Sequence, residues 1–184
     1  MARIKKGPQW AALKAADKHP LVRNADRMLF ANNDEFLNIR VGPHCLPDLL
    51  SALLGADAIT LTWRIFGNAG VAACQDQPIT HQFTKAALAT LAWPWRAQLF
   101  KTLFKLPHFR KHGVHWPKSP VPQTDTEMKV HWFDGSGCPL APGQRLLSNY
   151  SQDNYRLVQL NYYALGSAES YLEKCDRGQA NRDA

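Results

Sequence analysis

The chain of 184 residues is long enough to bury the core of one domain, and its 45% hydrophobic content excludes a disordered chain. No apolar stretch approaches the roughly 20 residues of a membrane-spanning helix, and the basic residues 1–6 lack the apolar segment of a secretory signal. The net charge of +7 predicts an anionic partner, such as a nucleotide, an anionic membrane surface or nucleic acid. The four cysteines stand far apart without CxxC spacing, which favours reduced thiols of a cytoplasmic protein over a zinc site or disulfides.

Helix and strand signals alternate along the first third of the chain. Residues 9–18, rich in alanine, predict a helix that ends before Pro20. The apolar run at residues 27–30 predicts a short buried strand. Residues 47–54 predict a second helix, with a proline in its first turn and Gly55 just past its end.

The clearest strand signal is AITLTWRIF at residues 58–66. Apolar and polar side chains alternate along it, which predicts one face toward the core and one face away from it. A weaker signal predicts a strand at residues 80–84, and residues 95–106 are interpreted as a helix. The basic stretch at residues 101–112 interleaves phenylalanines with cations. It fits an amphipathic helix with a solvated basic face, or a segment that binds a membrane surface or nucleic acid.

The second half of the chain contains a long irregular region. Residues 112–144 are rich in Pro and Gly and predict a functional or mobile loop within the domain, with a strand candidate at residues 129–133. RLVQLNYYAL at residues 156–165 is a strong strand candidate. Ser167 is a favourable N-cap for a helix that Gly178 would end.

The acidic turn NNDE at residues 32–35 directly follows the first predicted strand. Ligands of open α/β sheets bind at strand ends, and adjacent carboxylates repel each other unless a positive charge lies between them. Asn and Asp are also common turn formers, so these residues fit an ordinary solvated turn equally well. The turn alone leaves both interpretations open.

Four stretches stand in a distinctive order along the chain: NNDEF at residues 32–36, WRIFG at 63–67, FRKHGVHWP at 109–117, and QLNYY at 159–163 followed by Lys174 and Arg177. Together they resemble the family 2 glycosyltransferases, specifically a bacterial branch whose acidic motif is Asp-x-Asp-Glu-Phe. The resemblance implies that residues 1–184 form a single domain, the C-terminal part of a GT-A-type glycosyltransferase. The implied fold is an incomplete α/β domain with a mixed sheet flanked by helices.

The implied reaction is transfer of a sugar from a nucleotide-sugar donor to a hydroxyl of a saccharide, lipid or protein acceptor. In such enzymes the acidic motif holds a divalent cation, Mn²⁺ or Mg²⁺, that bridges the diphosphate of the donor. The resemblance assigns this metal to Asp34 and Asn32. It implies no nucleic-acid partner, and it suits a cytoplasmic protein at the inner face of the membrane.

The resemblance places eight further residues near the substrate: Glu35, Phe66, Gly67, His115, Asn161, Tyr162, Lys174 and Arg177. Structural alternatives stay open for them. Glu35 also fits a salt-bridge partner behind the site, and His115 fits a solvated loop residue. Trp63 fits the core better than the site, and one of the alternating pair Tyr162 and Tyr163 is expected to be packed. The cations near the end of the last helix suit that position whatever the function.

Three departures from the branch lower the expected activity. Asn32 replaces the first Asp of the motif, Tyr162 replaces a His, and the strands that hold the nucleoside in family members are absent before residue 9. We therefore expect a weakened or lost metal site and weak or negligible turnover by this chain. The alternative is a catalytically inactive, truncated remnant that acts as a binding or interaction module. Its uncovered sheet edge would favour self-association. Asp134 and Glu169 are candidates for the catalytic base, without support from the motifs.

Overall fold

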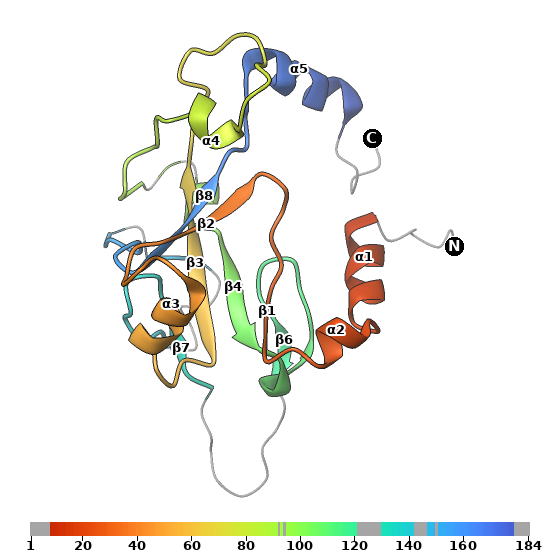
Figure 1. The fold of residues 1–184 in the computed structure, drawn as a ribbon, viewed down its shortest axis with the longest axis vertical. Helices are drawn as coiled ribbons and strands as arrows, with labels where there is room; N and C mark the ends of the chain where they lie inside the picture. The colour runs from red at the N-terminus through yellow and green to blue at the C-terminus, as the bar shows by residue number, and fades with distance from the viewer. Residues whose placement is uncertain are drawn as a thin grey trace, which may run out of the picture.

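The fold is a curled mixed sheet flanked by helices (Figure 1), as seen in a computed structural model that describes residues 8–91, 93, 95–120, 130–141, 147–149 and 151–178. This architecture confirms the α/β class expected from the sequence. In the part of the chain that the structure describes, no helix is long and apolar enough to cross a membrane.

The helices are short and lie around the sheet: α1 (Pro8–Ala16), α2 (Pro20–Arg23), α3 (Leu46–Ala52), α4 (Ile79–Gln82) and α5 (Ala168–Arg177). The helices predicted at residues 9–18 and 47–54 correspond to α1 and α3, and the helix predicted after Ser167 is α5. The Ser167 side chain accepts a hydrogen bond from Ser170 N, and Gly178 ends α5 with a φ of 70°. In Figure 1, α4 and α5 lie together at the upper end of the molecule, while α1 and α2 lie to one side, near β1.

The strands form one large sheet and one small hairpin: β1 (Arg27–Leu29), β2 (Glu35–Ile39), β3 (Ala58–Ile65), β4 (Phe100–Lys105), β5 (Phe109–Lys111), β6 (Lys118–Pro120), β7 (Trp132–Phe133) and β8 (Val158–Tyr162). The order in the large sheet is β1-β4-β3-β8-β2, and β7 also pairs with β3. The pairs β3–β8 and β3–β7 are parallel, and the others are antiparallel. β5 and β6 pair only with each other, and the 3₁₀ turns η1 (Trp95–Gln98) and η2 (Leu106–His108) flank β4.

β3 is the central strand, and both of its edges are occupied. β4 pairs with Ala58 to Thr62 on one edge, while β7 and β8 follow one another along the other edge. The strand predicted at residues 58–66 is confirmed, but its burial differs from the prediction. Thr60 and Thr62 are buried as well as the apolar residues, because both faces of β3 are covered up to Trp63. Alternation along a sequence cannot reveal a strand that is covered on both faces.

The helix predicted at residues 95–106 is wrong, because this segment is η1 followed by β4. Aromatic and β-branched residues at Phe100, Thr102 and Phe104 alternate with Lys101, Leu103 and Lys105, which is the period of a strand. The amphipathic helix predicted at residues 101–112 is wrong for the same reason. Its first cation does not face solvent, since the Lys101 side chain is fully buried.

Two other local predictions need correction or shortening. The strand predicted at residues 80–84 is the helix α4, whose turn closes with hydrogen bonds from His81 N and Gln82 N to Pro78 O. The strand predicted at residues 129–133 is confirmed only at β7, and residue 129 lies outside the described residues. β2 was not predicted from the sequence. The acidic residues 32–35 were interpreted as the turn that ends the strand at residues 27–30, whereas Glu35 is the first residue of β2.

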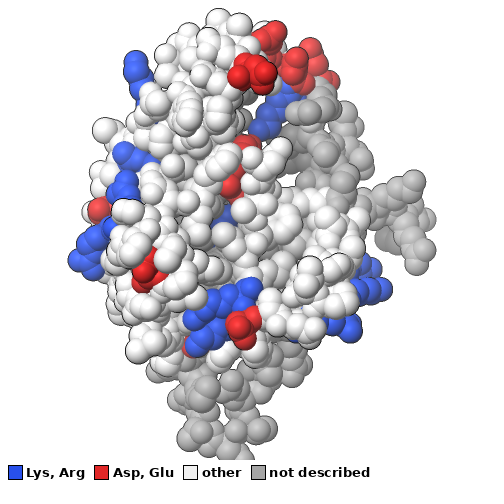
Figure 2. All heavy atoms as spheres, in the orientation of Figure 1, with Lys and Arg blue, Asp and Glu red and all other residues white. Residues whose placement is uncertain are grey.

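The main core lies between the sheet and α3. It combines buried side chains of α3, β2, β3, β4 and β8, including Leu49, Leu53, Ile59, Leu61 and Leu160. A smaller cluster of Phe104, Phe109 and Trp132 packs at the other end of β4. Figure 2 shows Lys and Arg side chains in separate groups over the face it draws, with acidic side chains among them. The net positive charge therefore does not form one continuous patch on that face.

Candidate functional site

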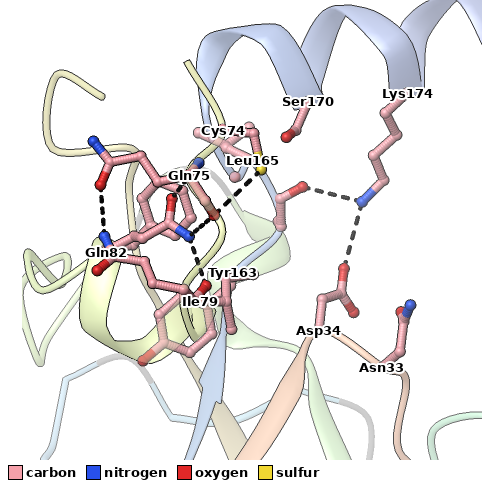
Figure 3. A pocket seen from close by; sticks show the side chains of 14 residues that line it. Asn33, Asp34, Cys74, Gln75, Ile79, Gln82, Tyr163, Leu165, Ser170 and Lys174 are labelled. Carbon is pink, nitrogen blue, oxygen red and sulfur yellow. Dashed lines mark hydrogen bonds and ion pairs between the residues drawn. The ribbon is translucent and has the colours of Figure 1, made fainter. Parts of the chain in front are cut away.

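A pocket of about 350 Å³ lies where α4 and α5 meet the turn before β2 (Figure 3). Its polar lining consists largely of groups that both donate and accept hydrogen bonds: Asn33, Gln75, Gln77, Gln82, Tyr163 and Ser170. Asp34 and Lys174 are the charged residues of the lining. The lining also includes the apolar side chains of Ile79, Phe83 and Leu165, so segments that are far apart in the sequence meet at one cavity of mixed character.

The backbone of the acidic turn holds Asp34 at the edge of this pocket. Glu35 N donates to Asn32 O at 3.2 Å, which closes the turn. Tyr163 N donates to Asp34 O at 2.9 Å, which ties the turn to the segment after β8. Figure 3 shows the Asp34 side chain pointing toward α5. The acidic turn therefore lies before β2, not at the free end of β1.

Lys174 reaches from α5 to Asp34. Its Nζ lies 3.4 Å from Asp34 Oδ2 and donates to the carbonyl oxygen of Ala164 at 3.0 Å. About half of the Lys174 side chain remains exposed (48%). The pocket therefore holds an anion and a cation of its own chain in contact.

The start of α5 fixes the far wall of the pocket. Ala168 N and Glu169 N donate to the carbonyls of Val71 and Ala72, and the Glu169 carboxylate accepts from Cys74 N at 2.9 Å. These bonds hold the segment that leads to α4 against α5. Glu169, a candidate base from the sequence, therefore positions this wall and is not part of the pocket lining.

The glutamines of the α4 segment form one network. Gln82 Nε2 donates to the carbonyls of Gln75 and Gln77, both at 2.8 Å, and Gln77 Nε2 donates to Gln75 Oε1 at 2.8 Å. These bonds fold residues 75–82 into a compact loop that exposes amide groups to the pocket. Three glutamines within eight residues were the only sequence signal for this wall.

Glu35 turns away from the pocket into a buried polar cluster. Its carboxylate accepts from Asn32 N at 2.8 Å and from Trp63 Nε1 at 2.9 Å, and it lies 3.7 Å from Lys101 Nζ. Lys101 Nζ also donates to Val114 O at 3.0 Å. Burial raises the pKa of Glu35, against the Asn32 hydrogen bond and the Lys101 charge. Burial also lowers the pKa of Lys101, against the attraction of Glu35.

His115 and Tyr162 belong to the same buried region. The His115 ring lies 5.5 Å from the Trp63 ring, and its Nδ1 lies 3.1 Å from Phe100 O. Burial lowers the pKa of His115, which favours the neutral ring. The Tyr162 ring lies 4.3 Å from the Trp63 ring, and Tyr162 is not part of the pocket lining. The structure therefore does not bring these two predicted substrate residues to the pocket.

The other residues predicted near the substrate divide between the pocket wall and its surroundings. Phe66 stacks on Tyr163 at 4.7 Å and so lies directly behind the pocket. Gly67 N donates to Lys85 O, and Asn161 Oδ1 accepts from Gln159 Nε2, but neither Gly67 nor Asn161 is part of the pocket lining. The side chain of Arg177 lies outside the described part of the structure.

Together with Phe83, Tyr163 is an aromatic residue of the pocket lining that the sequence motifs did not place near the substrate. It packs edge-on against Phe36 at 5.6 Å, and burial raises its pKa, so its hydroxyl stays protonated as a donor and acceptor. The alternation of Tyr162 and Tyr163 predicted that one of them would be packed, and Tyr163 is the buried one, held between Phe36 and Phe66 at the pocket wall. The backbone bond from Tyr163 to Asp34 ties it to the acidic turn, and no sequence pattern reveals that bond.

The described side chains do not supply the donor set of a divalent cation. A hard cation takes several oxygen ligands, with carboxylates foremost. Asp34 is already paired with Lys174, while the Asn32 amide donates to Glu35 at 3.3 Å and does not line the pocket. Within the described ranges, no three His, Cys, Asp or Glu side chains are grouped so that they could hold a metal ion. The metal site at Asp34 and Asn32 therefore remains a prediction, and the observed positions of these two side chains do not fit it.

Asp134, the other candidate base, has a structural role in a turn. Its carboxylate accepts from Ser136 N at 2.9 Å and Cys138 N at 2.8 Å, and it is buried. It does not line the pocket. The four cysteines are free thiols, which agrees with the reduced state expected from their spacing.

No protein-family model matches this sequence, and a search of curated proteins gives no match. The interpretation of the pocket therefore depends on its own chemistry and on the motifs that meet there.

Proposed function

We propose that this protein is of the glycosyltransferase type and that the pocket between α4, α5 and the acidic turn binds a nucleotide-sugar. The proposed reaction moves the sugar to a hydroxyl of a saccharide, lipid or protein acceptor. The sheet would be of the GT-A type, with the acidic turn at the pocket. The α/β architecture is compatible with this proposal.

One observation carries the proposal: residues from separate motifs of the resemblance meet at one pocket. Asp34 comes from the acidic motif, Tyr163 and Lys174 come from the late block, and Phe66 of WRIFG stacks on Tyr163. These motifs lie far apart in the sequence. Their meeting at one cavity is the result expected if they serve one ligand.

The chemistry of the lining supports a saccharide ligand. Sugar hydroxyls both donate and accept hydrogen bonds, and so do the amide and hydroxyl groups of Asn33, Gln75 and Ser170. A small number of placed polar groups around a concave site is the usual way in which small ligands are oriented. The Lys174 ammonium supplies the positive charge that a diphosphate would require.

A second candidate is a saccharide-binding module without turnover. Transfer to a hydroxyl requires a base that accepts the proton as the bond to the anomeric carbon forms. Asp34 is the carboxylate of the described lining, and it is ion-paired with Lys174. The one carboxylate of the described lining is therefore engaged with a cation, which favours binding over catalysis.

A donor-turnover assay separates the two candidates. The purified chain is incubated with a panel of UDP-sugars, with and without Mn²⁺ and an acceptor mixture, and UDP release is measured. UDP release above that of a Gln82→Ala variant supports the enzyme. Saturable binding without UDP release supports the binding module. Neither binding nor release with any donor would contradict both.

A further inference from the structure

Lys174 occupies the position at which the acidic motif would be expected to hold a metal. Its Nζ contacts Asp34 Oδ2 at 3.4 Å and the Ala164 carbonyl oxygen at 3.0 Å, and Figure 3 shows it reaching down from α5 toward Asp34. A divalent cation bound to the Asp34 carboxylate would have to displace this ammonium, because like charges would otherwise lie side by side. We propose that the Lys174 ammonium, held by Asp34, is the resident cation that binds the phosphate oxygens of the ligand without a divalent metal. This inference rests on the proposed function only in naming the phosphate group as part of a nucleotide-sugar.

The geometry leaves the ammonium able to bind a ligand. An ammonium has three donor protons, and the structure gives Lys174 two acceptors among the described residues. About half of the side chain is exposed, and it lines the pocket. One donor proton therefore remains for an oxygen in the cavity.

The charges of the surrounding residues also support Lys174 as the cation that binds the phosphate. Glu35, the second carboxylate of the acidic turn, is buried beside Lys101 and accepts from Asn32. It is thus removed from the pocket, and Asp34 is left to hold one cation of single charge. A lone carboxylate with one ammonium matches an ion pair, whereas a divalent cation calls for further carboxylates.

Asp34 has a defined part in this arrangement. It does not contact the phosphate, whose charge would repel it, but holds the ammonium in place. Asp34 is therefore a positioning residue, and Lys174 is the residue that binds the anion. The two roles predict a large loss of anion binding on substitution of Lys174 and a small change on substitution of Asp34, which a metal site would not produce.

The test is calorimetric titration of the full chain with UDP, with a panel of UDP-sugars and with inorganic pyrophosphate, first in EDTA and then with Mn²⁺. We expect binding in EDTA, changed less than about twofold by Mn²⁺. Lys174→Gln should weaken binding about tenfold, the loss expected for one charge-assisted hydrogen bond, and Lys174→Arg should retain most of it. Lys85→Gln, which removes the same charge from an exposed position outside the pocket lining, should bind as the parent does.

Asp34→Asn separates the two kinds of site. If Asp34 is a metal ligand, this variant loses an Mn²⁺-dependent affinity. If Asp34 positions Lys174, the variant binds pyrophosphate in EDTA within about threefold of the parent, because removal of a nearby negative charge offsets the loss of position. Thermal unfolding of each variant shows whether it is folded.

The outcomes distinguish this inference from the proposed function. UDP-sugar binding that requires Mn²⁺ would overturn the inference and leave the proposed function standing. Pyrophosphate binding in EDTA that depends on Lys174, without any preference for UDP-sugars, would support the inference and contradict the proposed function. A Lys174→Gln variant that binds as tightly as the parent would overturn the inference, and so would the absence of any binding.

Discussion

At the scale of single residues, the acidic turn has two carboxylates with different roles. Asp34 faces the pocket and pairs with Lys174, while Glu35 turns into the core and pairs with Lys101. The hydrogen bonds from Asn32 N and Trp63 Nε1 hold the Glu35 carboxylate in place. The buried pair thus orients the turn from behind and leaves Asp34 at the pocket.

The buried pair predicts strongly coupled effects on stability. Lys101→Met leaves the Glu35 carboxylate buried without its cation and should lower the free energy of unfolding by about 3 kcal/mol. In the double variant Glu35→Gln and Lys101→Met, neither charge remains, so much of that loss should be recovered. The measurement is urea unfolding of the parent, both single variants and the double variant.

Lys85→Met is the matched control for this cycle, because the Lys85 side chain is exposed and forms no ion pair with any described residue. It should change the free energy of unfolding by less than about 0.5 kcal/mol. Losses in the double variant equal to the sum of the two single losses would show that Glu35 and Lys101 are not coupled.

At the scale of elements, the turn after β7 determines where β8 begins. Gly135 O accepts from Leu157 N and Val158 N, and Asp134 and Ser136 close the turn around it. This contact sets β8 beside β7 on the same edge of β3. The position of Tyr163 and α5, and with it the pocket, follows from where β8 starts.

Gly135→Ala tests the close approach at this turn. A methyl group there would meet the carbonyl oxygen of Val158 at 2.6 Å and that of Asn154 at a still shorter distance. Both obstacles are backbone atoms, so the variant should lose about 1–3 kcal/mol of stability. Gly67→Ala is the control, since nothing lies within 4 Å of its added methyl. Equal midpoints of thermal unfolding for the two variants would contradict this, because they would show that the turn accommodates the methyl group without loss of stability.

Elements with strong local signals were predictable from the sequence, and those that depend on distant partners were not. The caps of α5 and the pattern of β3 act within a few residues, so Ser167, Gly178 and residues 58–66 indicated them. β4 was missed because Lys101 suggested a solvated helix face, whereas Glu35 neutralises it inside the fold. In the candidate site, the sequence motifs indicated Asp34 and Lys174, which both line the pocket. The wall formed by Gln75, Gln77 and Gln82 was not predictable, because hydrogen bonds between the start of α5 and residues 71–74 bring this segment to the pocket.

At the scale of the whole molecule, the sheet brings three distant segments to one end. β2 carries the acidic turn, β8 leads to Tyr163 and α5, and the bonds from α5 to Val71 and Ala72 draw in the α4 segment. Figure 1 shows α4 and α5 together at this end, above β2 and β8. Loss of any one segment would open the pocket, so a ligand bound there should stabilise all three together.

The most direct test of the proposed pocket is an NMR titration of the isotope-labelled chain with UDP-sugars, following the backbone amide signals. We predict saturable shifts concentrated at Asn33, Asp34, Gln75, Gln82 and Ser170, with the signals of the β5–β6 hairpin unchanged. Saturable shifts centred on any other surface, or no shifts at millimolar ligand, would contradict the assignment of this pocket to a nucleotide-sugar.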